Sequence, residues 1–132
     1  MLRAIVTIVT ASLVAAPLLA QPRYSGGNEP VTLSASETDP CTSGVIADQG
    51  PEGAVGVFPG PSKELEISDY IAGGTPVWVC ETSADSEMLG VIYANFPDTD
   101  CEVSSPVEND VDYIGPCESG WVEVNTVKLL AG

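Results

Sequence analysis

The feature that most restricts the fold is the division of the chain into short apolar runs by clusters of glycine, proline and aspartate. In GVIAD, AVGVF and PVWVCE, apolar side chains recur at every second position. This alternation is typical of half-buried strands, and no stretch has the period of a convincing amphipathic helix. The predicted strands are 44–48, 54–58, 65–68, 76–81, 88–94, 120–124 and 127–130. Turn clusters such as DQGPEG, AGG and ANFPDTD separate them, and the pattern predicts an all-β fold, a small barrel or sandwich.

The cysteines add covalent constraints to this fold. They are Cys41, Cys80, Cys101 and Cys117, widely spaced and without a CxxC pair. Because zinc sites need thiolates at paired short spacings, the pattern favours two disulfides. Four cysteines allow three pairings, and the sequence does not choose among them. We expect Cys41–Cys80 and Cys101–Cys117, because the polar segment between the last two is broken by Pro106 and gains most from closure; each bond would contribute roughly 3 to 4 kcal/mol.

The N-terminus predicts export. Arg3 precedes an uncharged, mostly apolar run, and Ala20 offers a small residue to a signal peptidase, so residues 1–20 are expected to be a cleaved signal, with a retained anchor as the alternative. Residues 21–40 are rich in proline, glycine, serine and acidic residues, which predicts a flexible tether. A folded domain is expected over 41–132, in the periplasm or outside a bacterial cell, with no membrane contact after cleavage.

Charge limits the possible partners. The chain has 19 acidic and 4 basic residues, a net charge of -15, and loss of Arg3 with the signal would leave 3 minus 19, or -16. Nucleic acid and anionic lipid would be repelled. The acidic surface serves solubility or attracts a basic protein partner.

Catalytic and metal-binding patterns are missing from the sequence. The chain has no histidine, which excludes Ser-His-Asp and Cys-His mechanisms, and oxidised cysteines are not nucleophiles. Among 19 carboxylates, some pair always falls at a plausible catalytic distance, so such pairs have no diagnostic value. The acidic run DTDCE at 98–102 would need glycine and glutamate at positions where the chain has Val103 and Asn109 to form a calcium loop. We expect neither an enzyme nor a bound metal or cofactor.

Four stretches carry a family resemblance: VGVFPGPS (55–62), GGTPVWVCE (73–81), MLGVIY (88–93) and SGWVEVNTV (119–127). Together they resemble bacterial SH3-like (SH3b-type) domains, and the segments CEVSSPV and YIGPCESGWV resemble an exported, disulfide-containing subgroup of unknown function. The matching positions are Val55, Val57, Gly60, Pro61 and Ser62 in the opening motif, Gly74, Val77 and Val79 in the middle strand, and Gly120, Trp121 and Val122 in the closing strand.

The resemblance implies a small SH3-like barrel of five to seven short strands, with an inserted disulfide-stapled loop at roughly residues 95–118. It also implies attachment to cell-wall peptidoglycan or to a short peptide. The chain departs from the family pattern at Phe58, where arginine is usual, at Gly56, where asparagine is usual, and at Met88 or Leu89, where tryptophan often stands. The missing tryptophan argues against the ligand groove of the family, and a fold does not by itself supply a function.

Aromatic side chains are the remaining candidates for a binding site. The candidate ligand-binding residues are Trp78, Tyr93, Tyr113 and Trp121, which could offer ring faces to a peptide or sugar, although most aromatics in so small a barrel serve the core. In the strand 76–81 the two valines share one face and Trp78 lies on the other.

The end of the inserted loop is predicted to have a structural role. Pro116 and Cys117 are expected to hold it against the last strand, so that Trp121 enters the barrel in one register.

The function expected from these observations is a non-catalytic exported binding module for a cell-wall peptide or glycan. The module is expected to be a monomer. Two alternatives stay open. One is an acidic interaction module that regulates a basic envelope protein, and the other is a purely structural envelope protein. A salt series would discriminate the first two, because association steered by net charge weakens steeply with added salt.

Overall fold

The computed structural model describes residues 28–51 and 53–130, which form nine β-strands, one 3-10 turn and no α-helix. The strands are β1 (Thr32–Leu33), β2 (Thr42–Ile46), β3 (Ala54–Val57), β4 (Asp69–Ala72), β5 (Pro76–Thr82), β6 (Met88–Tyr93), β7 (Val111–Asp112), β8 (Glu118–Glu123) and β9 (Val127–Leu129), with the 3-10 turn η2 at Val124–Thr126. The predicted all-β class is confirmed. The predicted export signal, residues 1–20, lies outside the described residues.

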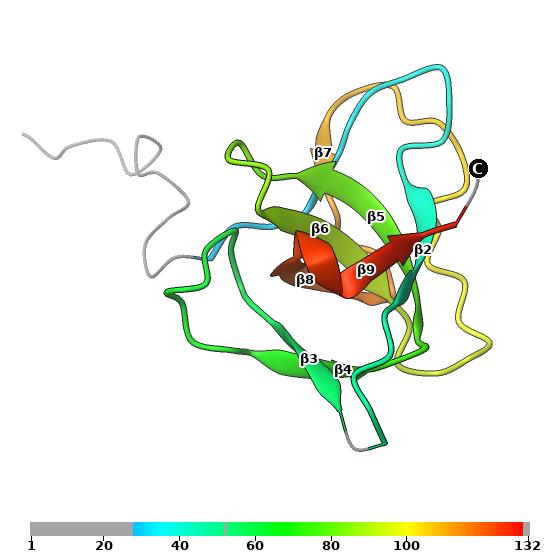
Figure 1. Ribbon diagram of the computed structural model, residues 1–132. Helices are drawn as coiled ribbons and strands as arrows, with labels where there is room; N and C mark the ends of the chain where they lie inside the picture. The colour runs from blue at the N-terminus through cyan, green and yellow to red at the C-terminus, as the bar shows by residue number, and fades with distance from the viewer. Residues whose placement is uncertain (1–27, 52, 131–132) are drawn as a thin grey trace, which may run out of the picture.

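Five antiparallel strands form the central sheet, in the order β8-β6-β5-β2-β9 (Figure 1). The pairs β3–β4 and β1–β7 form two small separate sheets, so the sheets are not closed into the small barrel that was expected. The β3–β4 hairpin is tied to β8 by one bridge, in which the amides of Phe58 and Trp121 each donate to the other's carbonyl at 2.7 and 2.9 Å. Beyond Phe58 the Pro59 carbonyl instead accepts from the Glu29 amide at 2.8 Å, so the ladder does not continue.

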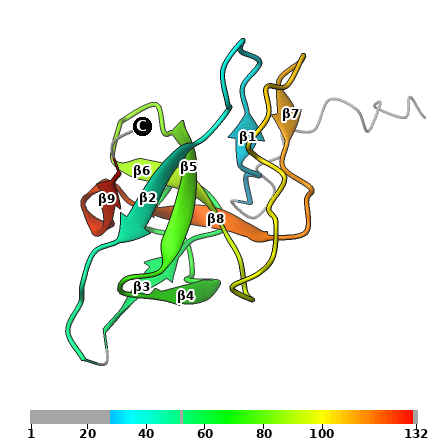
Figure 2. The same cartoon turned by 90° about the vertical axis from the view of Figure 1, so that its right-hand side faces the viewer.

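The central sheet is covered on both faces. All six residues of β6 are buried, which is the pattern of a strand packed from both sides. Leu89, Val91 and Tyr93 belong to a hairpin-side core beneath β3 and β4. Its members are Ile46, Val55, Val57, Ile71, Val77, Leu89, Val91, Tyr93 and Val122. Met88 and Ile92 point to the opposite side, where β1, β7 and the loop after β6 cover the sheet (Figure 2).

The second cluster is called the loop-side core. Its members are Val31, Leu33, Cys41, Phe58, Cys80, Met88, Ile92, Cys101, Val103, Tyr113 and Trp121. Val77 lies in the hairpin-side core with Val79 against it, whereas Cys80 and the half-buried Trp78 face the loop-side core. The predicted division of β5 into two faces is therefore confirmed.

The N-terminal segment, residues 28–33, is part of the packed domain, although the sequence analysis assigned it to a tether. Val31 and Leu33 are only 1% and 5% exposed. The Val31 carbonyl accepts from the Tyr113 amide at 2.8 Å, and the Thr32 amide donates to the Glu81 carboxylate at 2.9 Å. Two alternating apolar residues are too few to signal a strand, so the expected boundary at residue 40 is wrong for this segment. Residues 21–27 lie outside the described residues.

Both expected disulfides are present, Cys41–Cys80 and Cys101–Cys117, with Cα atoms 4.1 and 5.2 Å apart. The second closes the inserted loop, here called the stapled loop, which runs from residue 94 to residue 117. Although its sequence is mostly polar, the loop places Cys101, Val103 and Tyr113 in the loop-side core. The loop therefore adds apolar cover to the sheet.

The observed strands differ from the predicted ones mainly around residues 65–72. The predicted strand 65–68 is absent, since Leu65 lies in a bend and residues 66–68 have no regular secondary structure, and the chain pairs with β3 only from Asp69. Ser68 precedes this pairing and donates to the Val57 carbonyl through both its amide, at 2.8 Å, and its hydroxyl, at 3.1 Å. Strands β1 and β7 were not predicted, because each has only two residues.

Candidate functional site

Trp121 is a structural residue. Its side chain is only 1% exposed, and its indole Nε1 donates to the Glu29 carbonyl at 2.8 Å. The adjacent Gly120 is needed for this packing, because a Cβ there would collide with the Val57 side chain. With its ring buried and its donor occupied, Trp121 offers nothing to a ligand from solution.

Tyr93 joins the central sheet to the β3–β4 hairpin. Its hydroxyl donates to Asp69 Oδ2 at 2.7 Å, and the residue is 5% exposed. Burial raises the pKa of Tyr93, and the hydrogen bond to Asp69 raises the pKa further, because both favour the neutral phenol. This arrangement fixes the hairpin over the sheet and leaves the ring inaccessible.

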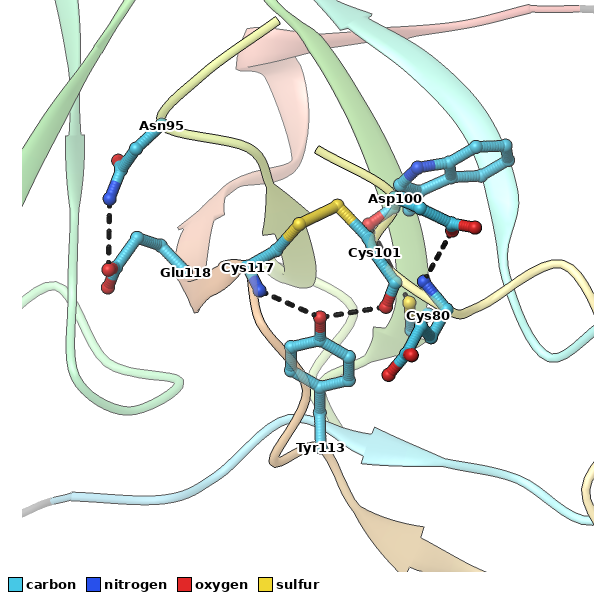
Figure 3. Close-up of a disulfide and its surroundings, with 9 residues drawn as sticks. Cys80, Asn95, Asp100, Cys101, Tyr113, Cys117 and Glu118 are labelled. Atoms are coloured by element: carbon cyan, nitrogen blue, oxygen red, sulfur yellow. Dashed lines mark hydrogen bonds between the residues drawn. A yellow bond between two sulfur atoms is a disulfide. The ribbon is translucent and has the colours of Figure 1, made fainter. Parts of the chain in front are cut away.

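Tyr113 bonds to both ends of the disulfide-closed segment 101–117 of the stapled loop. Its hydroxyl donates to the Cys101 carbonyl at 2.8 Å and accepts from the Cys117 amide at 3.1 Å, beside the disulfide that joins these residues (Figure 3). Burial raises the pKa of Tyr113, although the bond from the Cys117 amide opposes the shift. The predicted structural role of the YIGPC stretch agrees with these contacts, and Tyr113 is not part of an open site.

Trp78 has a different environment from the other three. It is half-buried on β5 and lines a hollow of about 670 Å³, called the Trp78 hollow. One wall is the turn between β4 and β5, and the other is the beginning of the stapled loop. The lining residues are Gly73, Gly74, Thr75, Pro76, Trp78, Ala94, Asn95, Pro97, Thr99 and Cys101. None of the ten carries a charge, although the chain has 19 acidic residues.

Both walls of the Trp78 hollow are held by local bonds. In the turn, Gly74 adopts a φ of 83°, which favours glycine, and its amide donates to the Ile46 carbonyl at 2.7 Å. In the loop, Cys101 is fixed by its disulfide to Cys117. The Asp100 carboxylate accepts from the Glu102 amide at 2.9 Å and caps the turn there (Figure 3). Because these walls are already ordered, a ligand that entered the hollow would lose little free energy to the ordering of the protein.

Carboxylates lie next to the lining of the Trp78 hollow, one through a hydrogen bond and two through the chain. Asn95, a lining residue, donates from Nδ2 to Glu118 Oε1 at 3.0 Å (Figure 3). Asp98 and Asp100 alternate with lining residues of the loop wall and are exposed. The hollow therefore combines an aromatic face and an uncharged lining with acidic residues adjacent to that lining.

Other hollows along the described residues lack this combination. One of about 470 Å³ beside Val79 and Leu129, and one of about 300 Å³ beside Lys63, have no aromatic side chain in their linings. Within residues 28–51 and 53–130, no group of three or more cysteine, aspartate or glutamate side chains is arranged to hold a metal ion. The described part of the chain also contains no helix that is long and apolar enough to cross a membrane.

The structure thus brings none of the four predicted aromatic residues together in one site, and only Trp78 lines an open surface. The other lining residues were not predicted, since the clusters AGG and ANFPDTD indicate only turns. No protein-family model, curated protein or solved structure matches the chain.

Proposed function

We propose that the protein is a non-catalytic, exported binding module that holds a cell-wall peptide or glycan in the Trp78 hollow. The observation that carries this proposal is the half-buried Trp78 in an uncharged hollow with fixed walls. Small-ligand sites are typically concave, partly aromatic and about 300 to 1,000 Å³ in volume, and this hollow lies within that range. A ring face beside small polar groups suits the flat face of a sugar or the backbone of a peptide.

Two further observations support the proposal. The disulfides indicate an oxidising environment, which agrees with the export signal proposed for residues 1–20. The strand order β8-β6-β5-β2-β9, with η2 between β8 and β9, is compatible with the SH3-like resemblance. The additional cover from residues 28–33 and from the stapled loop would then be specific to the disulfide-containing subgroup.

The test is co-sedimentation of residues 21–132 with purified peptidoglycan. We expect the protein to be retained at physiological and at high salt. Trp78→Leu, which keeps apolar volume but removes the ring, should lose retention while its circular dichroism spectrum stays unchanged. Tyr70→Leu is the matched control, because Tyr70 is 64% exposed and does not line the hollow. Absence of retention at any salt, or equal retention of both variants, would contradict the proposal.

The net charge favours a second candidate, an acidic module that binds a basic envelope protein. Of the two lysines among the described residues, Lys63 pairs with Glu123 at 3.6 Å, so the surface field is strongly negative. Such a complex would form rapidly at low salt and weaken as salt is added. Retention that disappears with salt, equally in the parent protein and in Trp78→Leu, would favour this candidate.

A further inference from the structure

The charges around the Trp78 hollow bear on which part of a wall ligand enters it. Cell-wall peptides carry both primary amines and carboxylates, which have opposite preferences for a charged site. Glu118 is bonded to the lining residue Asn95, and Asp98 and Asp100 are interleaved with the lining residues of the loop wall. With one carboxylate bonded to a lining residue and two others next to lining residues in the chain, the local potential is negative.

The nearest lysine on this face of the sheet lies farther from the Trp78 hollow than the carboxylates do. Lys128 lies on the same sheet face, but Val45 is paired with both Pro76 and Lys128 and separates them. Two strand spacings amount to about 10 Å. This is about one Debye length in physiological salt, so Lys128 contributes little at the hollow. Among the described residues, a carboxylate in the hollow would have three acidic residues nearby and no close cation.

The aromatic face of Trp78 also favours a positively charged group. The negative ring face of a tryptophan attracts ammonium groups, most strongly where water is partly excluded. Trp78 is half-buried and has no charged neighbour within the lining. We infer that the Trp78 hollow takes the ammonium-bearing part of a wall peptide, over the Trp78 ring, while the carboxylates of the peptide stay outside. This inference rests on the proposed function and specifies its ligand.

The experiment compares untreated peptidoglycan with peptidoglycan whose free amines have been acetylated. We expect acetylation to weaken retention of residues 21–132 by at least about fivefold, which is the effect of losing the cation–π interaction alone. Glu118→Gln keeps an acceptor for Asn95 but removes the charge, and should weaken retention by up to about fivefold. Lys128→Gln is the matched control and should leave retention unchanged or raise it. Lower retention of Lys128→Gln would indicate an anionic ligand and overturn the inference.

The outcomes separate the inference from the proposed function. Equal retention on acetylated and untreated peptidoglycan, still lost in Trp78→Leu, would leave the proposed function intact and overturn the ammonium inference. If untreated peptidoglycan does not retain the protein, the proposed function fails, and tryptophan fluorescence is titrated with the peptide Gly-Lys-Gly, acetylated at its N-terminus and amidated at its C-terminus, and with the Nε-acetylated form of the same peptide. Quenching by the first peptide alone, absent in Trp78→Leu, would support an ammonium site for another ligand. Equal responses to both peptides, or no response, would overturn the inference.

Discussion

The hydroxyl of Tyr113 is expected to stabilise the stapled loop. The size of this effect can be measured by removing the hydroxyl oxygen alone. Tyr113→Phe deletes an oxygen that bonds to the Cys101 carbonyl and the Cys117 amide, at 2.8 and 3.1 Å. Cys101 is 5% exposed, so water cannot readily replace the lost partner at its carbonyl. A buried polar group left unsatisfied costs about 1 to 3 kcal/mol. We expect a loss of about 2 kcal/mol in the free energy of unfolding.

The assay is equilibrium unfolding in urea, followed by tryptophan fluorescence under oxidising conditions. With a slope of about 1 to 3 kcal/mol per molar urea, this loss lowers the midpoint by about 1 M. Tyr70→Phe removes the same atom from a side chain that is 64% exposed, and should change stability by less than about 0.5 kcal/mol. Equal effects of the two substitutions would refute the reasoning.

Removal of the Cys101–Cys117 disulfide extends the test. Replacing both cysteines with alanine should cost about 3 kcal/mol, given their sequence separation of 16. Because the Tyr113 hydroxyl bonds to the same two residues, its effect should be smaller once the disulfide is gone, with a coupling of at least about 0.5 kcal/mol. Additive effects would mean that the hydroxyl and the disulfide stabilise the loop independently.

Three further predictions concern packing and ionisation. Gly120→Ala should destabilise the fold by about 1 to 3 kcal/mol in urea unfolding, because its Cβ would collide with Val57. Burial raises the pKa of Glu81 above its ordinary 4.5, so its contribution to stability is present below its unfolded pKa and is lost as pH rises through the folded pKa. Glu81→Gln should therefore gain stability relative to the parent protein as pH rises above about 4.5, and a constant difference would contradict this. Burial and Asp69 raise the pKa of Tyr93 above its ordinary 10.0, so its phenolate absorbance should develop only with alkaline unfolding, and stability should fall as pH rises past that value. A phenolate step near pH 10 in the folded parent protein that is missing from Tyr93→Phe would contradict this expectation.

The sequence by itself determined the all-β class, the positions of most strands and the two faces of β5. These properties are local, since alternation at period two and the turn preferences of glycine, proline and aspartate act over a few residues. The expected disulfide pairing was also correct. It rested on the polar segment after Cys101, whose covalent closure reduces the entropy of the unfolded chain.

The tertiary structure alone decided which aromatic ring is accessible and where the domain begins. Trp78 and Trp121 stand in similar strand contexts, yet one lines a hollow and the other lies under residues 28–33. Val31 is buried because β7 and the stapled loop return to it, far away in the sequence. Burial depends on which distant segments meet over a residue, and two-residue strands leave no periodic pattern from which this could be foreseen.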